Sequence, residues 1–191
     1  MNELKEIAEL FGRFISQPSK EWKALSESQE TDNEQFYRRY LYPIFGMITL
    51  VAFVGLFLTN AHFDLQLALK RSILSITSVF IGFYLAAFLL SEGLIRVFHQ
   101  PRELNLCQRF TGYASLPIYS SFILLSLFPE FFFIYLFTLY SIYIVWEGAI
   151  PYMQMNESEQ LKFTVLASTI ILLSPYLINL LMFMLMPGLR A

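Results

Sequence analysis

Hydrophobic residues form long runs along this chain, and short polar stretches separate the runs. The first run extends from Tyr42 to Asn60 without a charged residue. A helix needs roughly 20 apolar residues, at about 1.5 Å each, to cross the hydrocarbon core of a bilayer. Five segments approach that length, and we expect each of them to be a transmembrane helix. They are Leu41–Asn60, Ile73–Val97, Thr111–Phe128, Phe131–Tyr152 and Phe163–Met186.

A tight turn is expected between the third and fourth of these helices. The sequence Phe128-Pro129-Glu130 places proline next to an acidic residue, which is typical of a turn and not of a helix interior. Pro117 and Pro175 lie inside the third and fifth helices, where proline leaves a backbone carbonyl without its helical partner. We expect a kink at each of these prolines, and a ligand cavity formed by broken helices is the alternative.

Small residues recur along the second predicted span, at Ser75, Ser78, Gly82, Ala86 and Gly93. Small side chains let two membrane helices approach each other closely. We interpret this stripe as a packing surface and not as an ion path.

The first part of the chain follows a different pattern, and we predict two units. Residues 1–41 form an N-terminal segment with eight acidic and six basic residues, and residues 42–191 form the transmembrane domain. Apolar residues recur at helical spacing within residues 1–16, so we predict an amphipathic helix parallel to the membrane plane. The apolar residues of this helix are Leu4, Ile7, Ala8, Phe11, Phe14 and Ile15.

A second short helix is predicted from Ser19 to Leu25, because Pro18 suits the first turn of a helix. Trp22 within this helix has the ring type that anchors proteins at the membrane–water interface, and we assign it that role. Residues 26–35 are mostly polar and are predicted to form a linker.

The composition identifies the class of protein. Hydrophobic residues make up 56% of the chain and charged residues only 15%, whereas soluble domains usually carry about 25% charged residues. Together with the helical runs, this indicates an all-α, polytopic membrane protein whose partner is the lipid bilayer. The net charge of −2 provides no basic surface for nucleic acid.

The distribution of Lys and Arg residues predicts the orientation. With five spans, ten of the 13 basic residues lie on the side of the N-terminus and three lie on the other side. Basic loops favour the cytoplasmic side of a membrane. We therefore expect a cytoplasmic N-terminus and an external C-terminus.

Two predicted helical hairpins resemble each other in sequence. The second span contains LLSEGLIRVF and the fourth contains IVWEGAIPYM, and each has an acid followed by glycine, at Glu92 and Glu147. The spans that follow begin with RFTGYAS at Arg109 and KFTVLAS at Lys162. We predict a parallel repeat of two hairpins about an axis along the membrane normal, with chance similarity as the alternative.

Three stretches carry a resemblance to a known family: QPSKEWKAL, YASLPIY and LYSIYIVWEGAIP, over residues 17–25, 113–119 and 139–151. In these stretches the chain resembles bacterial members of the Yip1-domain family of five-span membrane proteins. The eukaryotic branch acts in early secretory trafficking, membrane shaping and Rab GTPase binding. That branch has an Asp-Leu-Tyr-Gly-Pro pattern, whereas this chain has Tyr40-Leu41-Tyr42-Pro43. The resemblance therefore implies an inner-membrane protein, and GTPase binding is not carried over.

Glu92 and Glu147 are the only acidic residues within the predicted spans. Arg96 follows Glu92 by four residues, in the favourable order for an ion pair on a helix. Glu147 shares a helix face with Tyr140 and Tyr143, whose hydroxyls are candidate hydrogen-bond donors. The structural interpretation is hydrogen bonding between helices near the membrane boundary, and the functional one is a proton- or cation-coupled site.

The sequence contains no motif of a common catalytic, metal or cofactor site, such as H-E-x-x-H, a phosphate-binding glycine loop or a nucleophile elbow. His62 and His99 fall on opposite sides of the membrane in the predicted topology, and Cys107 is the only cysteine. We expect neither an enzyme nor a cofactor.

The expected function is that of a non-enzymatic membrane-organising or adaptor protein. Residues 1–41 would bind a cytoplasmic protein partner, and assembly into a homo-oligomer stays open. The alternative is a small transporter or channel that uses Glu92 and Glu147 as its coupled site.

Overall fold

The computed structural model describes residues 2–28, 33–59 and 65–185, and every regular element in these ranges is helical. The helices before the first long apolar stretch are α1 (Asn2–Ser16), α2 (Pro18–Glu27), α3 (Asn33–Phe36) and the π-helical turn η1 (Tyr37–Leu41). They are followed by α4 (Tyr42–Thr59), α5 (Leu65–Phe98), α6 (Leu104–Ala114), α7 (Leu116–Leu127), the 3-10 turn η2 (Phe132–Ile134), α8 (Tyr135–Thr138), α9 (Tyr140–Ala149) and α10 (Gln160–Leu185).

The prediction of an all-α membrane protein is confirmed. Within the described residues, four helical stretches are long and apolar enough to cross a bilayer: Asn33–Leu56, Leu65–Phe98, Phe132–Ala149 and Gln160–Leu185. The pair α6 and α7 passes the same test only when both helices are taken together, and they are bent by 45° at their junction. The number of spans is therefore four, or five if the bent pair is one broken span.

The third predicted span differs from the helices that are found. Thr111–Phe128 is not one helix, because the chain breaks at Ser115 between α6 and α7. Pro117 lies in the first turn of α7, where its missing N–H and its ring prevent a helix from continuing through from α6. Pro175 lies inside α10, which is continuous from Gln160 to Leu185.

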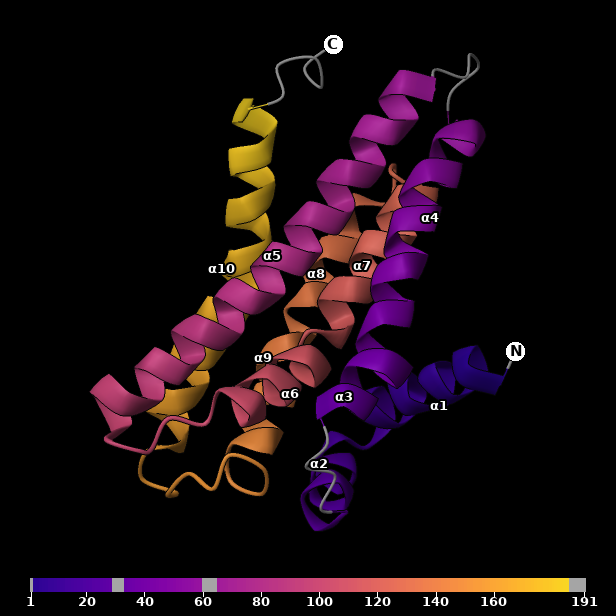
Figure 1. The fold of residues 1–191 in the computed structure, drawn as a ribbon. Coiled ribbons are helices and arrows are strands. Elements are labelled where there is room, and N and C mark those ends of the chain that lie inside the picture. The colour runs from indigo at the N-terminus through magenta and orange to yellow at the C-terminus, as the bar shows by residue number, and fades with distance from the viewer. Residues whose placement is uncertain (1, 29–32, 60–64, 186–191) are drawn as a thin grey trace.

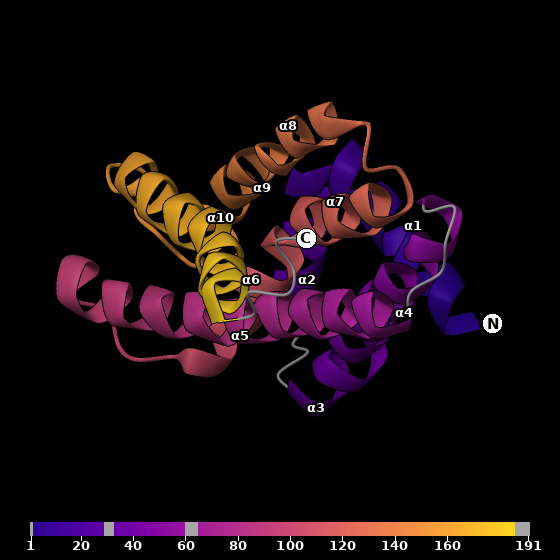
Figure 2. The same ribbon diagram turned by 90° about the horizontal axis from the view of Figure 1, so that it is seen from above.

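The long helix α5 crosses the bundle diagonally, and α4 and α10 pack against it (Figures 1 and 2). Its 34 residues correspond to about 51 Å of helix. At Gly82 a Cβ atom would lie only 2.7 Å from Cα of Pro175, so α5 and α10 approach each other almost backbone to backbone. Ser78 and Ala86 of the same stripe are also buried.

The helices α1, α2 and α3, which we call the platform, lie at one end of the bundle. Figure 1 shows α1 running across this end, and the opposite end holds the start of α5 and the end of α10. The boundary predicted at residue 41 lies inside a helical stretch, since α3, η1 and α4 follow one another without a break. Residues 29–32 of the predicted linker lie outside the described residues.

The two proposed hairpins differ in helix length and continuity. Ser115 and Ser168 end the two matching sequences, yet the helix breaks at Ser115 and continues through Ser168 in α10. Gly93 of α5 lies against Leu166 of α10, whereas Gly148 of α9 lies against Trp22 of the platform. The structure does not confirm the repeat.

Candidate functional site

Trp22 joins the platform to the transmembrane helices. Its side chain is 0% exposed, and its indole N–H donates a hydrogen bond of 2.9 Å to the backbone carbonyl of Ile144 in α9. The ring stacks on Phe110 of α6 at a centroid distance of 5.0 Å and also contacts Tyr152 at 4.9 Å. Trp22 is therefore a core residue, and its assignment as an anchor in the lipid interface is wrong.

Gly148 provides the space that Trp22 occupies. A Cβ atom at this position would lie 2.6 Å from Cε2 of Trp22 and 2.9 Å from Cε2 of Phe110. Real Cβ atoms essentially never approach that closely, so a side chain here would displace one of two packed rings. The glycine after Glu147 therefore has a structural role in seating the platform.

Further contacts hold α1 in place. Phe14 is buried and stacks on Tyr113 of α6 at a centroid distance of 5.5 Å. The Tyr140 hydroxyl of α9 donates a hydrogen bond of 2.7 Å to the carbonyl oxygen of Ile15. The sequence suggested that this hydroxyl would donate a hydrogen bond to Glu147, whereas in the structure it donates one to α1 of the platform.

A polar network holds α3 against the same end of the bundle. Arg109 of α6 donates one hydrogen bond of 2.8 Å to Oδ1 of Asn33 and another of 3.1 Å to the Tyr152 hydroxyl. The Asn33 amide in turn donates to Gln108 at 3.2 Å. Each platform helix is therefore bonded to, or packed against, a helix of the transmembrane part.

Glu92 lies in a charged cluster near the end of α5. Arg96 donates to its carboxylate at 3.2 Å, and Arg102 from the following segment lies 3.9 Å from the other oxygen. The Glu92 side chain is 25% exposed, so this is a partly solvated ion-pair network of modest strength.

Glu147 is half-buried in α9. Within residues 2–28, 33–59 and 65–185, no hydrogen bond or ion pair joins its carboxylate to Glu92, Tyr140 or Tyr143. The structure therefore brings Glu92 together with Arg96 but does not bring the two acids into a shared site.

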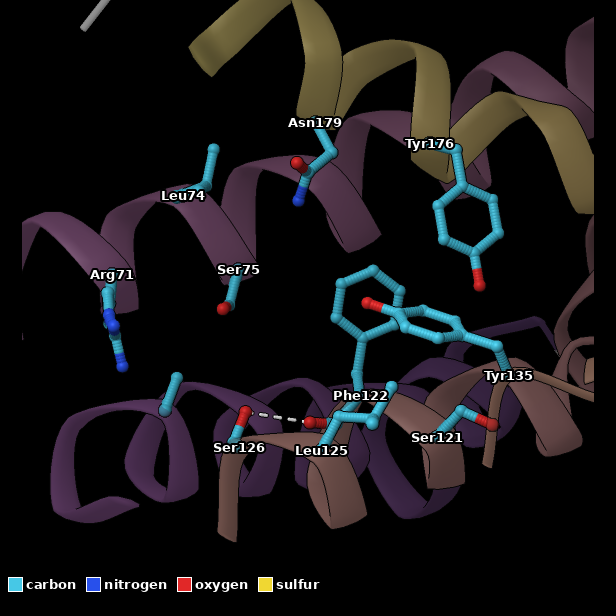
Figure 3. Close-up of a pocket in the computed structure, with 11 residues that line it drawn as sticks. Arg71, Leu74, Ser75, Ser121, Phe122, Leu125, Ser126, Tyr135, Tyr176 and Asn179 are labelled. Carbon is cyan, nitrogen blue, oxygen red and sulfur yellow. Dashed lines mark hydrogen bonds between the residues drawn. The ribbon is translucent and has the colours of Figure 1, made fainter. Parts of the chain in front are cut away.

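A polar pocket lies between five helices toward the opposite end of the bundle. Figure 3 shows its lining from α4, α5, α7, α8 and α10, around a cavity of about 270 Å³. Its polar lining residues are Arg71, Ser75, Ser121, Ser126, Tyr135, Tyr176 and Asn179. Neither Glu92 nor Glu147 lines it.

The pocket lining contains one formal charge, the guanidinium of Arg71, and no carboxylate. Ser121 and Ser126 donate 2.8 Å and 2.7 Å hydrogen bonds to carbonyls of their own helix. Pro117 lies one turn before Ser121, and Pro175 directly precedes Tyr176. The two prolines therefore adjoin the pocket without lining it.

Sequence reasoning missed this pocket because its residues are far apart in the chain. Ser75 was interpreted as part of a packing stripe, and Arg71 only as one of the basic residues of an external loop. A usable signal was Asn179, an amide within the apolar run of the last predicted span, since polar residues in spans usually face the bundle interior.

In the described part of the chain, no group of three or more His, Cys, Asp or Glu side chains could hold a metal ion. Cys107 is buried, and His62 lies outside the described residues.

A family model described as Yip1 domain matches residues 12–186 of the chain. The matched range begins near the end of α1 and extends past the end of α10, so it covers α2, α3 and all the long helices but only the last residues of α1. Neither a curated protein nor a solved structure matches the chain.

Proposed function

The chain belongs to the Yip1-domain family, and from this and its geometry we propose that it is a non-enzymatic membrane-organising protein. Its platform would increase the cross-sectional area of the protein at one face of the bilayer. A protein that is wider in one leaflet than in the other favours a curved membrane and changes the packing of nearby lipids. Amphipathic helices that lie at a membrane interface also change the packing of nearby lipids.

The asymmetry of the molecule supports this proposal. The platform, α6 and the connection between α9 and α10 all gather at one end of the bundle, while the opposite end consists mainly of helix ends (Figures 1 and 2). The apolar face of α1 turns toward the bundle, where Ile7, Phe11 and Ile15 line an apolar groove with residues of α4 and α7. More of the chain therefore lies at the platform end of the bundle than at the opposite end.

The buried and hydrogen-bonded attachment of the platform is the observation that carries the proposal. A loosely tethered helix would move aside when lipids pack against it, and it would transmit little stress to the bilayer. The buried Trp22 ring, with its hydrogen bond to Ile144, fixes α2 to α9 instead. The Tyr140 hydroxyl fixes the end of α1 in the same way.

An adaptor role is the second candidate, and the outer face of α1 favours it. Lys5, Glu6, Glu9 and Arg13 are exposed there, and Lys5 and Glu9 form an ion pair of 3.8 Å. A mixed charged face of this kind suits a soluble protein partner better than an anionic lipid surface.

We place the platform end in the cytoplasm and the protein in the inner membrane. The basis for the orientation is the excess of Lys and Arg residues on the side of the N-terminus, ten against three. The basis for the inner membrane is the resemblance to bacterial members of the family. The transporter alternative gains no support from the geometry, because Glu92 and Glu147 do not share a site and neither lines the polar pocket.

Partition of the reconstituted full chain between small and large vesicles tests the proposal. With the platform in the outer leaflet, verified by protease access, we expect enrichment in the small, strongly curved vesicles. Gly148→Leu should abolish the enrichment because its side chain displaces Trp22 and loosens the platform. Gly46→Leu is the matched control, since a Cβ atom at Gly46 meets nothing within 4 Å. Equal partition of the native protein would exclude the membrane-organising function.

A further inference from the structure

The polar pocket combines a cavity with a single positive charge, that of the exposed residue Arg71. Its volume of about 270 Å³ is many times the roughly 10–15 Å³ that a single water molecule needs. The space is therefore large enough for a polyatomic group with some of its water.

Arg71 is the only charged lining residue, and no lining residue is acidic. Within the ranges that the structure describes, no carboxylate lies at ion-pair distance from its guanidinium. A cation without an acidic partner attracts an anion. Its planar fork of N–H donors fits two oxygens of one phosphate or carboxylate group.

Two further groups face the same space. Figure 3 shows Ser75, one turn after Arg71 on α5, and Asn179 of α10 pointing into the pocket. Among the described residues, no hydrogen bond is found for either side chain. The hydroxyl of Tyr135 also points into this space (Figure 3). Together with Arg71, these groups provide hydrogen-bond donors from three helices around one volume.

From its position in the sequence, we expect Arg71 to lie at the depth of lipid phosphate groups. It lies two residues before Ile73, where the second predicted apolar run begins, and six residues after the start of α5. Arg71 would therefore lie near the interface between headgroups and hydrocarbon. Apolar neighbours in the pocket, among them Leu74, Phe122 and Leu125, suit the carbon atoms attached to such a group.

We propose that this pocket binds a phosphate-type oxyanion, which Arg71 pairs with and which Ser75 and Asn179 hold by hydrogen bonds. The oxyanion is either the phosphate of a lipid headgroup or free inorganic phosphate. This inference is independent of the membrane-organising function, because the pocket and the platform lie toward opposite ends of the bundle.

Binding to the purified full chain in neutral detergent tests the proposal. The probes are inorganic phosphate, a short-chain phosphatidic acid, and a diacylglycerol with the same chains but no phosphate, all at matched ionic strength. We expect saturable thermal stabilisation by at least one phosphate probe and none by the diacylglycerol. Response to both phosphate probes indicates a site for the shared oxyanion. Response to phosphatidic acid alone identifies the headgroup as the source, and response to phosphate alone identifies the free anion.

Substitutions of pocket residues, compared with a substitution of a neighbouring residue outside the pocket, show whether the phosphate probes bind in the pocket. Arg71→Gln should weaken phosphate binding about tenfold or more, which is the scale of one lost charge-assisted contact, and Asn179→Leu should weaken it by a smaller factor. Lys70→Gln is the matched control, because Lys70 is the neighbouring cation but does not line the pocket. The proposal fails if no phosphate probe binds, if the diacylglycerol binds equally well, if Arg71→Gln has no effect, or if Lys70→Gln weakens binding as much as Arg71→Gln.

Discussion

At the scale of single residues, Gly148 and Trp22 form one structural unit. The indole ring occupies the space in which a side chain at position 148 would lie, with contacts of 2.6 Å and 2.8 Å to a Cβ atom built there. A ring buried in this way contributes through packing, while its N–H contributes a hydrogen bond to a carbonyl 122 residues later in the chain. The pair thus connects the N-terminal helices to the fourth apolar stretch.

Gly148→Ala should destabilise the protein by about 1–3 kcal/mol, the usual cost of overpacking a filled core. The control, Gly46→Ala in α4, adds a methyl group where nothing lies within 4 Å. It should leave stability unchanged or raise it by up to about 1 kcal/mol, because alanine is the better helix former. Thermal unfolding of both variants in detergent measures the difference. Equal stability of the two variants would contradict the close packing at Gly148.

Trp22→Phe separates the ring from its hydrogen bond. The smaller aromatic ring keeps most of the packing but loses the donor to the Ile144 carbonyl, so we expect a loss of about 1 kcal/mol. Trp22→Ala also leaves a cavity and should cost about 3–5 kcal/mol. A chemical unfolding series of the two variants provides both values. If Trp22→Ala costs no more than Trp22→Phe, the ring is not part of the core.

The role of Trp22 was the residue-scale prediction that failed. An amphipathic tryptophan suits two environments, the membrane interface and a protein core in which its N–H finds a partner. Local sequence cannot distinguish them, because the partner carbonyl and the glycine that admits the ring both belong to α9. Arg96 beside Glu92 was easier to predict, since both residues lie on one helix at a spacing of four.

At the scale of elements, the broken helix α6–α7 is the main departure from a simple set of straight spans. Pro117 sets the position of the break, and the two parts are bent by 45°. Hydropathy predicted an apolar run here, because it averages over residues and does not register one missing N–H. The beginning of α6 at Leu104 was missed for the opposite reason, as its first turns contain polar residues such as Asn105 and Gln108.

We expect α6 and α7 to cross the membrane together as one broken span, because α6 lies at the platform end and α7 extends away from it (Figure 1). Cysteines placed at the exposed positions Asn105 and Glu130, in a Cys107→Ala background, should then react with an impermeant maleimide from opposite sides of sealed vesicles. Labelling of both positions from the same side would indicate a re-entrant loop and four spans.

The packing of α5 against α10 was partly predictable. The stripe of small residues indicated that another helix approaches closely, and Gly82 indeed lies against the backbone of Pro175. The identity of that helix did not follow from the stripe, because any apolar neighbour can cover small residues. The polar pocket was predictable only in part, because Asn179 indicated a polar residue inside a span, but Arg71 and Asn179 line one pocket only after α5 and α10 have packed.

At the scale of the whole molecule, the chain combines a rigid platform at one end with a polar pocket toward the other. Residues 1–41 were predicted to be a separate unit, and their polar composition gave good reason for that view. Yet four of the six aromatic residues among them are buried in the core of the bundle, namely Phe14, Trp22, Phe36 and Tyr40. Whether a segment is attached to the bundle therefore depends less on the number of its polar residues than on the burial of a few large aromatic side chains.

Tryptophan quenching tests the docking of the platform most directly, because the chain contains only two tryptophans. Trp146→Phe leaves Trp22 as the single fluorophore, and Trp22→Phe leaves Trp146, which is 37% exposed on the bundle surface. Each variant is reconstituted into bilayers and titrated with acrylamide from the aqueous phase and with brominated lipids from the membrane. The bromine atoms quench only those rings that contact lipid.

If the platform is docked, Trp22 resists both quenchers because protein surrounds its ring, whereas brominated lipids quench Trp146. Quenching of Trp22 by brominated lipids would show that it is an interface anchor after all. Quenching by acrylamide would show that α2 is detached from the bundle. Either result would contradict a rigid platform and remove the basis of the proposed membrane-organising function.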